Sequence, residues 1–299
     1  MAAYLAAKRS VDDRAIDRRV WDRFVDELDR RASETGGPLR ILEVGAGVGS
    51  MIARLAERDA FTGQVRYRAI DLEPATIADG LRRLPDWLEA TGYEVASTPN
   101  GLVATDPNGS IELEIRLESA DLFDVDDEVD AVVAAAVLDV VPLRAAIEQL
   151  STLLVNDGLL YAPTTFDGGT SFAPTDPLDD RIEGLYHRHM DELREQPGGS
   201  RAGRRLLCTL PDCGFETLAV GGGDWIVRPI DGEYPAGEEC FLSSILETID
   251  AALGEYSASE IDPERRERWI ERRFQELDRG VLTFVAHNLD VLATVDSNS

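Results

Sequence analysis

A short apolar run that enters a glycine-rich turn is the feature that most constrains this chain. Residues 40–44 read Arg-Ile-Leu-Glu-Val, glycines follow at positions 45, 47 and 49, and a helix is expected from about Ser50. Glycines let the backbone turn tightly and approach a ligand, and the free N–H groups of the helix start point into the same place. Asp71 closes a second expected hydrophobic strand, at 65–70, where an acid can bind ribose hydroxyls in a nucleotide-binding βαβ unit. The pattern predicts a cofactor that contains adenosine.

The spacing of these glycines departs from the dinucleotide fingerprint. A G-x-G-x-x-G motif starting at Gly45 would need a third glycine at position 50, which is Ser50. A diphosphate binds to N–H groups at a helix start, and the acid Glu43 contributes nothing to that. S-adenosylmethionine has no phosphate but carries an ammonium, a sulfonium and a carboxylate, so Glu43 suits it electrostatically. A flavin or nicotinamide site is the alternative interpretation of the turn.

Four motifs in order resemble those of the class I (Rossmann-like) S-adenosylmethionine-dependent methyltransferases, over residues 38–165. Residues 43–49 look like the first motif, and Asp71 looks like the ribose-binding acid. Residues 119–122 resemble the third motif, whose acid meets the adenine amino group, and residues 135–139 fall where the fourth strand opens onto the methyl donor. The cofactor site that the resemblance implies comprises Glu43, Gly45, Ala46, Gly47, Gly49, Asp71, Leu72, Asp121, Leu122 and Ala136.

The remaining elements alternate between helix and strand, which predicts a doubly wound sheet with crossover helices. Residues 129–135 are apolar apart from Asp130, which is typical of a central parallel strand buried on both faces. Residues 12–34 predict an amphipathic helix before the first strand, and residues 93–117 an inserted antiparallel hairpin. Together with the resemblance, this predicts an α/β fold with a mostly parallel seven-stranded sheet, an antiparallel last strand, an N-terminal helix, the hairpin and a helical lid. Further helices are expected at 74–90, 142–154, 178–194, 201–210, 237–253 and 263–279, and further strands at 65–70, 159–164, 215–220, 225–229 and 281–286.

A single methyltransferase domain is expected over residues 1–299. Residues 1–37 form an N-terminal helical extension, 38–165 the cofactor-binding core, 166–280 the substrate and lid segments with the sixth strand, and 281–299 the last strand and tail. The two late helices are candidates for a lid or for a homodimer contact. Three glycines at 221–223, beside an acid and Trp225, indicate either close backbone approach to a ligand or a β-bulge. Aromatic residues that could line a substrate pocket are Phe172, Trp225, Tyr234 and Phe241, with core packing as the alternative.

Methyl transfer from a sulfonium is an in-line displacement, which needs the acceptor atom about 3 to 3.5 Å from the methyl carbon. A base helps only where the acceptor must lose a proton. Asp139 follows the expected fourth strand and is one catalytic candidate, with a helix cap as its alternative role. His187 is the other, as a base carried by the lid. His187 and His189 point to different faces of a helix, so a metal site built on the pair is not expected.

Composition excludes several classes of function. The net charge of −27 lacks the basic footprint of nucleic-acid binding, so DNA or RNA methylation is not expected. Asp121 apart, the acids at 124–130 are interpreted as a solvated face, and we predict no metal requirement. Three cysteines without a C-x-x-C pair indicate neither a disulfide framework nor a zinc site. The start of the chain does not form a signal peptide and no apolar run reaches about 18 residues, so a cytoplasmic protein without membrane contact is predicted.

Lys8 is the only lysine in the chain, and every other side chain of fixed positive charge is arginine. Such an acidic chain with almost no lysine resembles proteins of salt-loving organisms, in which concentrated salt screens self-repulsion. A GC-rich genome would explain the arginines but not the size of the acidic excess.

The sequence therefore predicts S-adenosylmethionine-dependent methyl transfer to a small-molecule acceptor. The aromatic lid and anionic surface favour a neutral or cationic acceptor over a polyanion. Two alternatives stay open at this point: an NAD(P)-dependent oxidoreductase, and a non-catalytic protein that binds S-adenosylmethionine as a regulatory or structural ligand.

Overall fold

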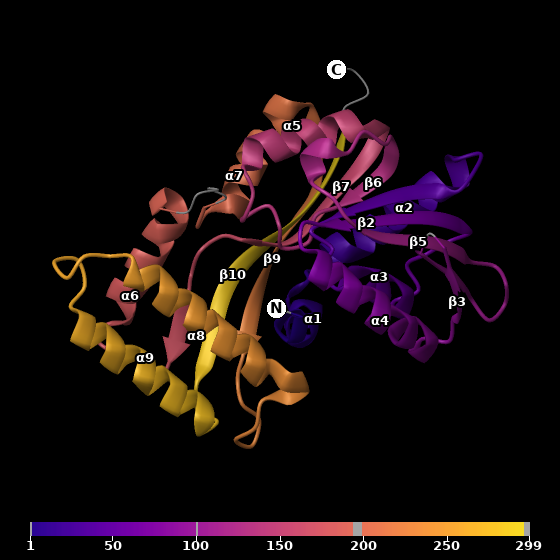
Figure 1. Ribbon diagram of the computed structural model, residues 1–299. Coiled ribbons are helices and arrows are strands. Elements are labelled where there is room, and N and C mark those ends of the chain that lie inside the picture. Colours follow the sequence, from indigo (N-terminus) through magenta and orange to yellow (C-terminus); the bar gives the residue numbers. More distant parts are fainter. Residues whose placement is uncertain (1, 100, 194–198, 296–299) are drawn as a thin grey trace.

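The computed structural model describes residues 2–99, 101–193 and 199–295, which form one mixed α/β structure around a long twisted sheet (Figure 1). Within the described residues the sheet has ten strands, in the order β3-β4-β5-β2-β1-β6-β7-β10-β8, with β9 paired to β10. The strands are β1 (Leu39–Val44), β2 (Gln64–Asp71), β3 (Glu94–Thr98), β4 (Gly101–Thr105), β5 (Glu112–Ser119), β6 (Val129–Val133), β7 (Leu154–Phe166), β8 (Ser171–Ala173), β9 (Phe215–Val227) and β10 (Thr283–Val295).

The centre of the sheet is parallel. Strands β5, β2, β1, β6 and β7 pair in parallel in that order, and β6 is buried along its whole length. Its one acid, Asp130, is buried and accepts hydrogen bonds from Arg40, so it does not belong to the solvated face expected for the acids of this segment. Strand β10 runs antiparallel to β7, and β9 antiparallel to β10. The prediction of a mostly parallel α/β sheet is confirmed. The count of seven strands was too low, because β3, β4 and the short β8 also join the sheet.

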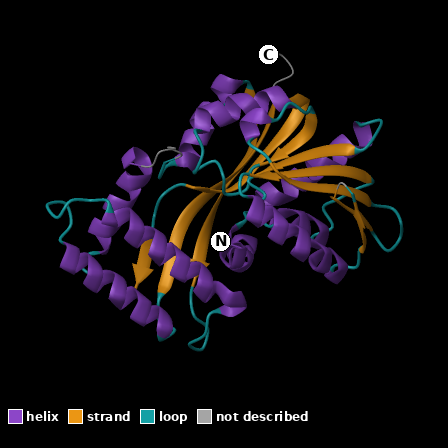
Figure 2. Ribbon diagram, in the orientation of Figure 1, coloured by secondary structure: helices purple, strands orange, loops and turns teal. Residues whose placement is uncertain are grey.

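Helices cover the sheet in three groups (Figures 1 and 2). Buried side chains of α2, α3 and α4 pack on one face of the parallel strands, and those of α5 and α7 pack on the other. Helices α6, α8 and α9 form a separate apolar cluster with α1, β8 and the neighbouring parts of β9 and β10. The helices are α1 (Ala2–Ala15), α2 (Arg18–Glu34), α3 (Ser50–Glu57), α4 (Pro74–Ala90), α5 (Leu143–Leu153), α6 (Asp179–Arg188), α7 (Ala202–Thr209), α8 (Glu238–Gly254) and α9 (Pro263–Asp278). No helix among the described residues has the length and apolar character needed to cross a membrane.

The N-terminal helix expected at 12–34 is in fact two helices, α1 and α2, separated by a corner at Asp17. The Asp17 carboxylate accepts hydrogen bonds from the backbone N–H groups of Arg19 and Val20, at 2.9 and 3.1 Å, and so caps α2. The Asp17 N–H donates to the fully buried Asp290 carboxylate at 2.7 Å. This corner turns α1 away from α2, and Figure 1 shows α1 between α3 and α8.

The glycine stretch 221–223 explains how the corner can lie so close to the sheet. Residues 215–227 form one continuous strand, so the expectation of two strands separated by the glycines was wrong. A Cβ on Gly223 would clash with the Ala15 carbonyl oxygen, and a Cβ on Gly221 would clash with the Asp17 side chain. The close backbone approach is therefore to the chain's own α1–α2 corner, and not to a ligand.

Other boundaries also differ from the expectation. The strand expected at 159–164 is longer and spans Leu154–Phe166. The last strand continues to Val295 instead of ending near Ala286, because it pairs with β7 and β9 along its length. The helix expected at 178–194 ends at Arg188 and continues as one π-helical segment, His189–Leu193; residue 194 lies outside the described residues.

Candidate functional site

A cavity of about 700 Å³ opens where the loops after β1 and β6 diverge. The chain order of the parallel strands reverses between these two strands, and ligands of open α/β sheets bind at such a switch point. The cavity is lined by the glycine turn after β1, by Ala135, Ala136, Asp139 and Val140 after β6, and by residues of α1, α6, α8, β9 and β10. It is therefore the candidate functional site.

The glycine turn has the backbone geometry that its sequence predicts. Gly45, Gly47 and Gly49 have φ angles of +66°, +55° and +79°, which L side chains rarely adopt. A Cβ on Gly45 would also come within 2.6 Å of the Val137 side chain. Gly49 is the N-cap of α3, so the N–H groups that start this helix follow directly on the turn.

Asp71 joins the end of β2 to the glycine turn. Its Oδ2 accepts a hydrogen bond from the Gly47 N–H at 2.9 Å, and its Oδ1 accepts from the Glu73 N–H at 3.0 Å. The parallel pairing of β1 with β2 brings their carboxyl ends together, which is why residues 24 positions apart meet. The acid and the turn thus form one unit at the edge of the sheet.

Glu43 lies beneath the turn and lines the cavity, although only 2% of the residue is exposed. The Tyr67 hydroxyl donates to its Oε2 at 2.9 Å. Burial raises the pKa of the Glu43 carboxyl to about 8, although the Tyr67 hydrogen bond and the charge of Arg54 act in the opposite direction. At neutral pH this carboxyl holds its proton, whereas the sequence suggested a permanent negative charge.

The predicted cofactor residues divide into two groups. Those that line the cavity are Glu43, Gly45, Ala46, Gly47 and Ala136. The others, Gly49, Asp71, Leu72, Asp121 and Leu122, follow the ends of β1, β2 and β5 outside the cavity lining.

Three residues of the second group differ in exposure and contacts. Leu72 is 65% exposed just beyond β2, whereas Leu122 is buried in the core under α5. The Asp121 Oδ1 accepts a hydrogen bond from the Phe123 N–H at 3.0 Å, which caps the short 3-10 helix η1 (Leu122–Asp124).

The two predicted catalytic residues also differ in position. Asp139 lines the cavity directly. His187 does not, but its Nε2 lies 2.9 Å from the hydroxyl oxygen of Thr170, which lines the cavity. Burial lowers the pKa of His187 below its ordinary value, so the ring is neutral at pH 7 and above. His189 lies elsewhere, with its Nε2 3.2 Å from the Glu255 carboxylate.

Sequence reasoning missed the contribution of α1. Tyr4, Leu5, Lys8 and Asp12 all line the cavity from this helix, and the Leu5 side chain approaches within 3.4 Å of the position that a Cβ on Gly47 would take. The helix carries alanines and charged residues instead of a strong apolar stripe, so its periodicity gave little signal. The one signal in the sequence that set this segment apart is that it contains the only lysine of the chain.

Of the four aromatic residues proposed for a substrate pocket, Trp225 alone lines the cavity. Phe172 and Phe241 are buried in the cluster around α8 and α9, and Tyr234 donates its hydroxyl to the Leu282 carbonyl at 2.8 Å.

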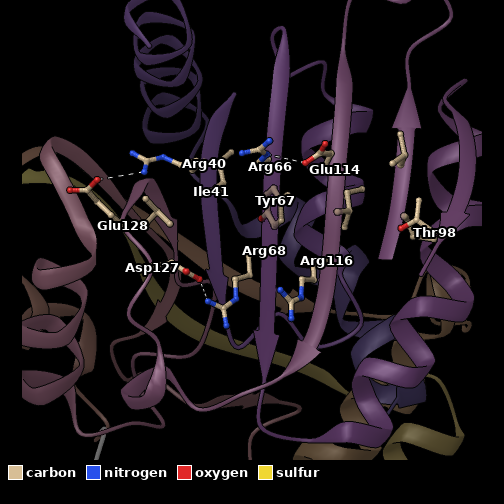
Figure 3. A pocket seen from close by; sticks show the side chains of 14 residues that line it. Arg40, Ile41, Arg66, Tyr67, Arg68, Thr98, Glu114, Arg116, Asp127 and Glu128 are labelled. Carbon is tan, nitrogen blue, oxygen red and sulfur yellow. Dashed lines mark hydrogen bonds and ion pairs between the residues drawn. The ribbon is translucent and has the colours of Figure 1, made fainter. Parts of the chain in front are cut away.

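A second cavity, of about 710 Å³, lies over β1, β2 and β5 on the charged face of the sheet (Figure 3). Alternation along β2 and β5 turns charged side chains to this face and apolar ones to the core. Its arginines are paired: the Arg66 Nε donates to Glu114 at 2.9 Å, and Arg40 lies 3.5 Å from Glu128. None of the predicted site residues lines this cavity, which is a charge-paired surface of the sheet.

No protein-family model and no curated protein matches the chain. Solved structures with a similar arrangement include a candidate methyltransferase of Bacillus halodurans, with 13% sequence identity, a TM-score of 0.49, and coverage of 91% of this chain and 98% of that chain. A cyclopropane synthase of Mycobacterium tuberculosis shows 13% identity, a TM-score of 0.42, and coverage of 90% and 83%. A phosphoethanolamine N-methyltransferase of Haemonchus contortus, in complex with S-adenosylmethionine, shows 14% identity, a TM-score of 0.42, and coverage of 92% and 52%. Similarity at this level does not extend to function, which has to be argued from the cavity itself.

Proposed function

We propose that this protein transfers a methyl group from S-adenosylmethionine to a small molecule bound in the same cavity. The observation that carries the proposal is the hydrogen bond between the Gly47 N–H and the Asp71 carboxylate. It joins a left-handed glycine turn to an acid at the end of the neighbouring strand, beside a cavity at the switch point of the sheet.

The residues at this edge of the sheet fit the parts of the cofactor. The backbone of Gly45 and Gly47 would lie against its methionine portion, Asp71 would bind the ribose hydroxyls, and Leu72 and Asp121 would meet the adenine. When bound, S-adenosylmethionine supplies an electrophilic methyl group on a sulfonium. Glu43, which holds a proton in the free protein, would release it as a positively charged group approaches, because an adjacent cation favours the carboxylate.

The cavity disfavours a dinucleotide. Its lining contains the acids Asp12, Asp139 and Glu247, besides the protonated Glu43, against two bases, Lys8 and Arg54. Arg54 is paired with Asp13, and Lys8 with Asp12. A diphosphate brings two negative charges and would find neither of these cations free, whereas the cofactor proposed here is cationic at its sulfonium and ammonium.

Thr170 and His187 would supply a base where the acceptor carries a proton. The Thr170 hydroxyl lines the cavity and lies within hydrogen-bonding distance of the neutral His187 ring, so a proton from the acceptor can pass through the hydroxyl to Nε2. Asp139 also lines the cavity and would orient the acceptor. Neither the proton transfer through Thr170 and His187 nor the orienting role of Asp139 requires a metal ion.

Release of S-adenosylhomocysteine from S-adenosylmethionine, measured by mass spectrometry with a mixture of small amines, phenols and alcohols, tests the proposal. We expect acceptor-dependent release, and we expect Thr170→Val to reduce kcat more than KM. Tight binding of S-adenosylmethionine without release on any acceptor would instead support a non-catalytic binding protein.

A further inference from the structure

Aromatic side chains line the part of the cavity that lies beyond the glycine turn. Tyr4 comes from α1, Phe166 from the end of β7, Tyr186 from α6 and Trp225 from β9. Aromatic rings carry a negative face, which attracts cations as well as apolar groups. Elements distant in sequence thus converge on a surface that suits an organic cation.

The charges of the cavity point in the same direction. Besides the protonated Glu43, the lining has three acids against two bases, and each of these bases is paired with a carboxylate. Glu247 lies at the exposed rim on α8, and Asp12 faces the cavity from α1. An anionic acceptor would be repelled by this lining, whereas a cationic one would be attracted.

Lys8 shows how an ammonium group is held in this cavity. Its Nζ lies 2.6 and 2.7 Å from the two carboxylate oxygens of Asp12 and 4.7 Å from the centroid of the Trp225 ring. A carboxylate and an indole face around one ammonium are the groups that proteins use to bind amines and quaternary ammonium ligands. The only lysine of the chain therefore occupies a ready-made ammonium subsite in the candidate active site.

We propose that the methyl acceptor is an amine, which binds as an ammonium ion on the face of Trp225 in the place that the Lys8 ammonium holds in the free protein. The proposal rests on the proposed function and adds the chemical class of the acceptor. The Lys8 ammonium can move out of the subsite because its four-carbon side chain is flexible and its partner Asp12 lies on the same helix. The carboxylate and the indole stay in position and receive the ammonium of the acceptor.

The reaction balances with these groups. The bound ammonium loses one proton through the Thr170 hydroxyl to His187, which exposes the nitrogen lone pair. That lone pair forms the new N–C bond as the C–S bond breaks, and the electron pair of the broken bond stays on sulfur. The products are S-adenosylhomocysteine and an ammonium ion with one more methyl group, and the proton leaves from His187 to solvent.

Calorimetry with choline and its neutral isostere 3,3-dimethylbutan-1-ol tests the ammonium subsite without turnover. The protein is first saturated with S-adenosylhomocysteine, and each probe is then titrated into that complex. We expect choline to bind at least about tenfold more tightly, because the isostere has the same shape without the charge. Equal binding of the two probes would overturn the inference while leaving the proposed function intact. Failure of S-adenosylhomocysteine to bind would overturn the proposed function, and this inference with it.

Three variants locate the subsite. Lys8→Met removes the internal competitor and leaves Asp12 available, so choline should bind more tightly than to the unaltered protein. Trp225→Leu removes the ring face and should abolish the preference for choline, whereas Trp225→Phe keeps a ring face and should retain most of it. Weaker choline binding by Lys8→Met would overturn the assignment. The affinity of each variant for S-adenosylhomocysteine shows whether the site has stayed folded.

Discussion

Asp71 holds the glycine turn through its hydrogen bond with the Gly47 N–H. In the proposed function it would also bind the cofactor ribose. Asp71→Ala should weaken S-adenosylhomocysteine binding by about 1.5 to 3 kcal/mol, the usual contribution of hydrogen bonds to a charged group. Asp71→Asn keeps the shape and one acceptor oxygen, so its loss should be smaller. Calorimetric dissociation constants of the two variants check this ranking. Unchanged affinity in Asp71→Ala would show that the ribose binds elsewhere.

Glu43 makes the free energy of unfolding depend on pH. Its pKa is raised from the ordinary 4.5 to about 8, so between these values the folded state holds a proton that the unfolded chain has released. The contribution of Glu43 to the free energy of unfolding therefore falls as pH rises from about 4.5 to about 8, by at most about 1.4 kcal/mol per pH unit, and is constant above. Glu43→Gln cannot titrate and lacks this slope. Urea unfolding of both proteins at several pH values measures the difference; parallel curves would contradict a buried, protonated Glu43.

At the scale of elements, the packing of the α1–α2 corner on β9 depends on glycine. Gly223→Ala should lower the free energy of unfolding by about 1 to 3 kcal/mol, the range for an overpacked contact, because its Cβ would meet the backbone of Ala15. Gly222→Ala is the matched control, since its Cβ would lie 3.4 Å from the His287 ring, at the edge of ordinary contact. Denaturant unfolding of the pair tests the corner; equal effects would argue against its close contact with the strand.

Elements with strong local signals were predictable, and elements fixed by tertiary contacts were not. The largely apolar strand Val129–Val133 and the helix Pro74–Ala90 follow from hydrophobic pattern alone. Helix α1 has too weak a pattern to be found that way, and its direction is set by the corner at Asp17. The glycines at 221–223 signalled a close approach, but the sequence could not say that the approaching group is the chain's own backbone.

The same distinction applies to the site. The glycine turn and Asp71 were predictable, because a strand, a turn and an acid lie close together in sequence and have a fixed geometric relation. The contribution of Tyr4, Lys8 and Trp225 to one cavity depends on how α1 packs against β9, which no local pattern encodes. The link from His187 to the cavity through Thr170 is likewise a property of the folded chain.

At the scale of the whole molecule, the net charge of −27 leaves many acids without a basic partner. Raising KCl from about 0.1 M to 1 M shortens the screening length from about 10 Å to about 3 Å and weakens this self-repulsion. The surface ion pairs that salt also weakens contribute little individually. The midpoint of thermal unfolding should therefore rise with KCl. A falling midpoint in calorimetry would show that the ion pairs outweigh the repulsion.

The most direct test of the central claim is calorimetric titration of the unaltered protein, in molar KCl, with S-adenosylmethionine, S-adenosylhomocysteine and NADH in parallel. We expect binding of the first two in the micromolar range, on the order of −8 kcal/mol, and no binding of NADH. Binding of NADH alone would contradict the assignment of the turn at Gly45–Gly49 to S-adenosylmethionine and would indicate a redox enzyme instead.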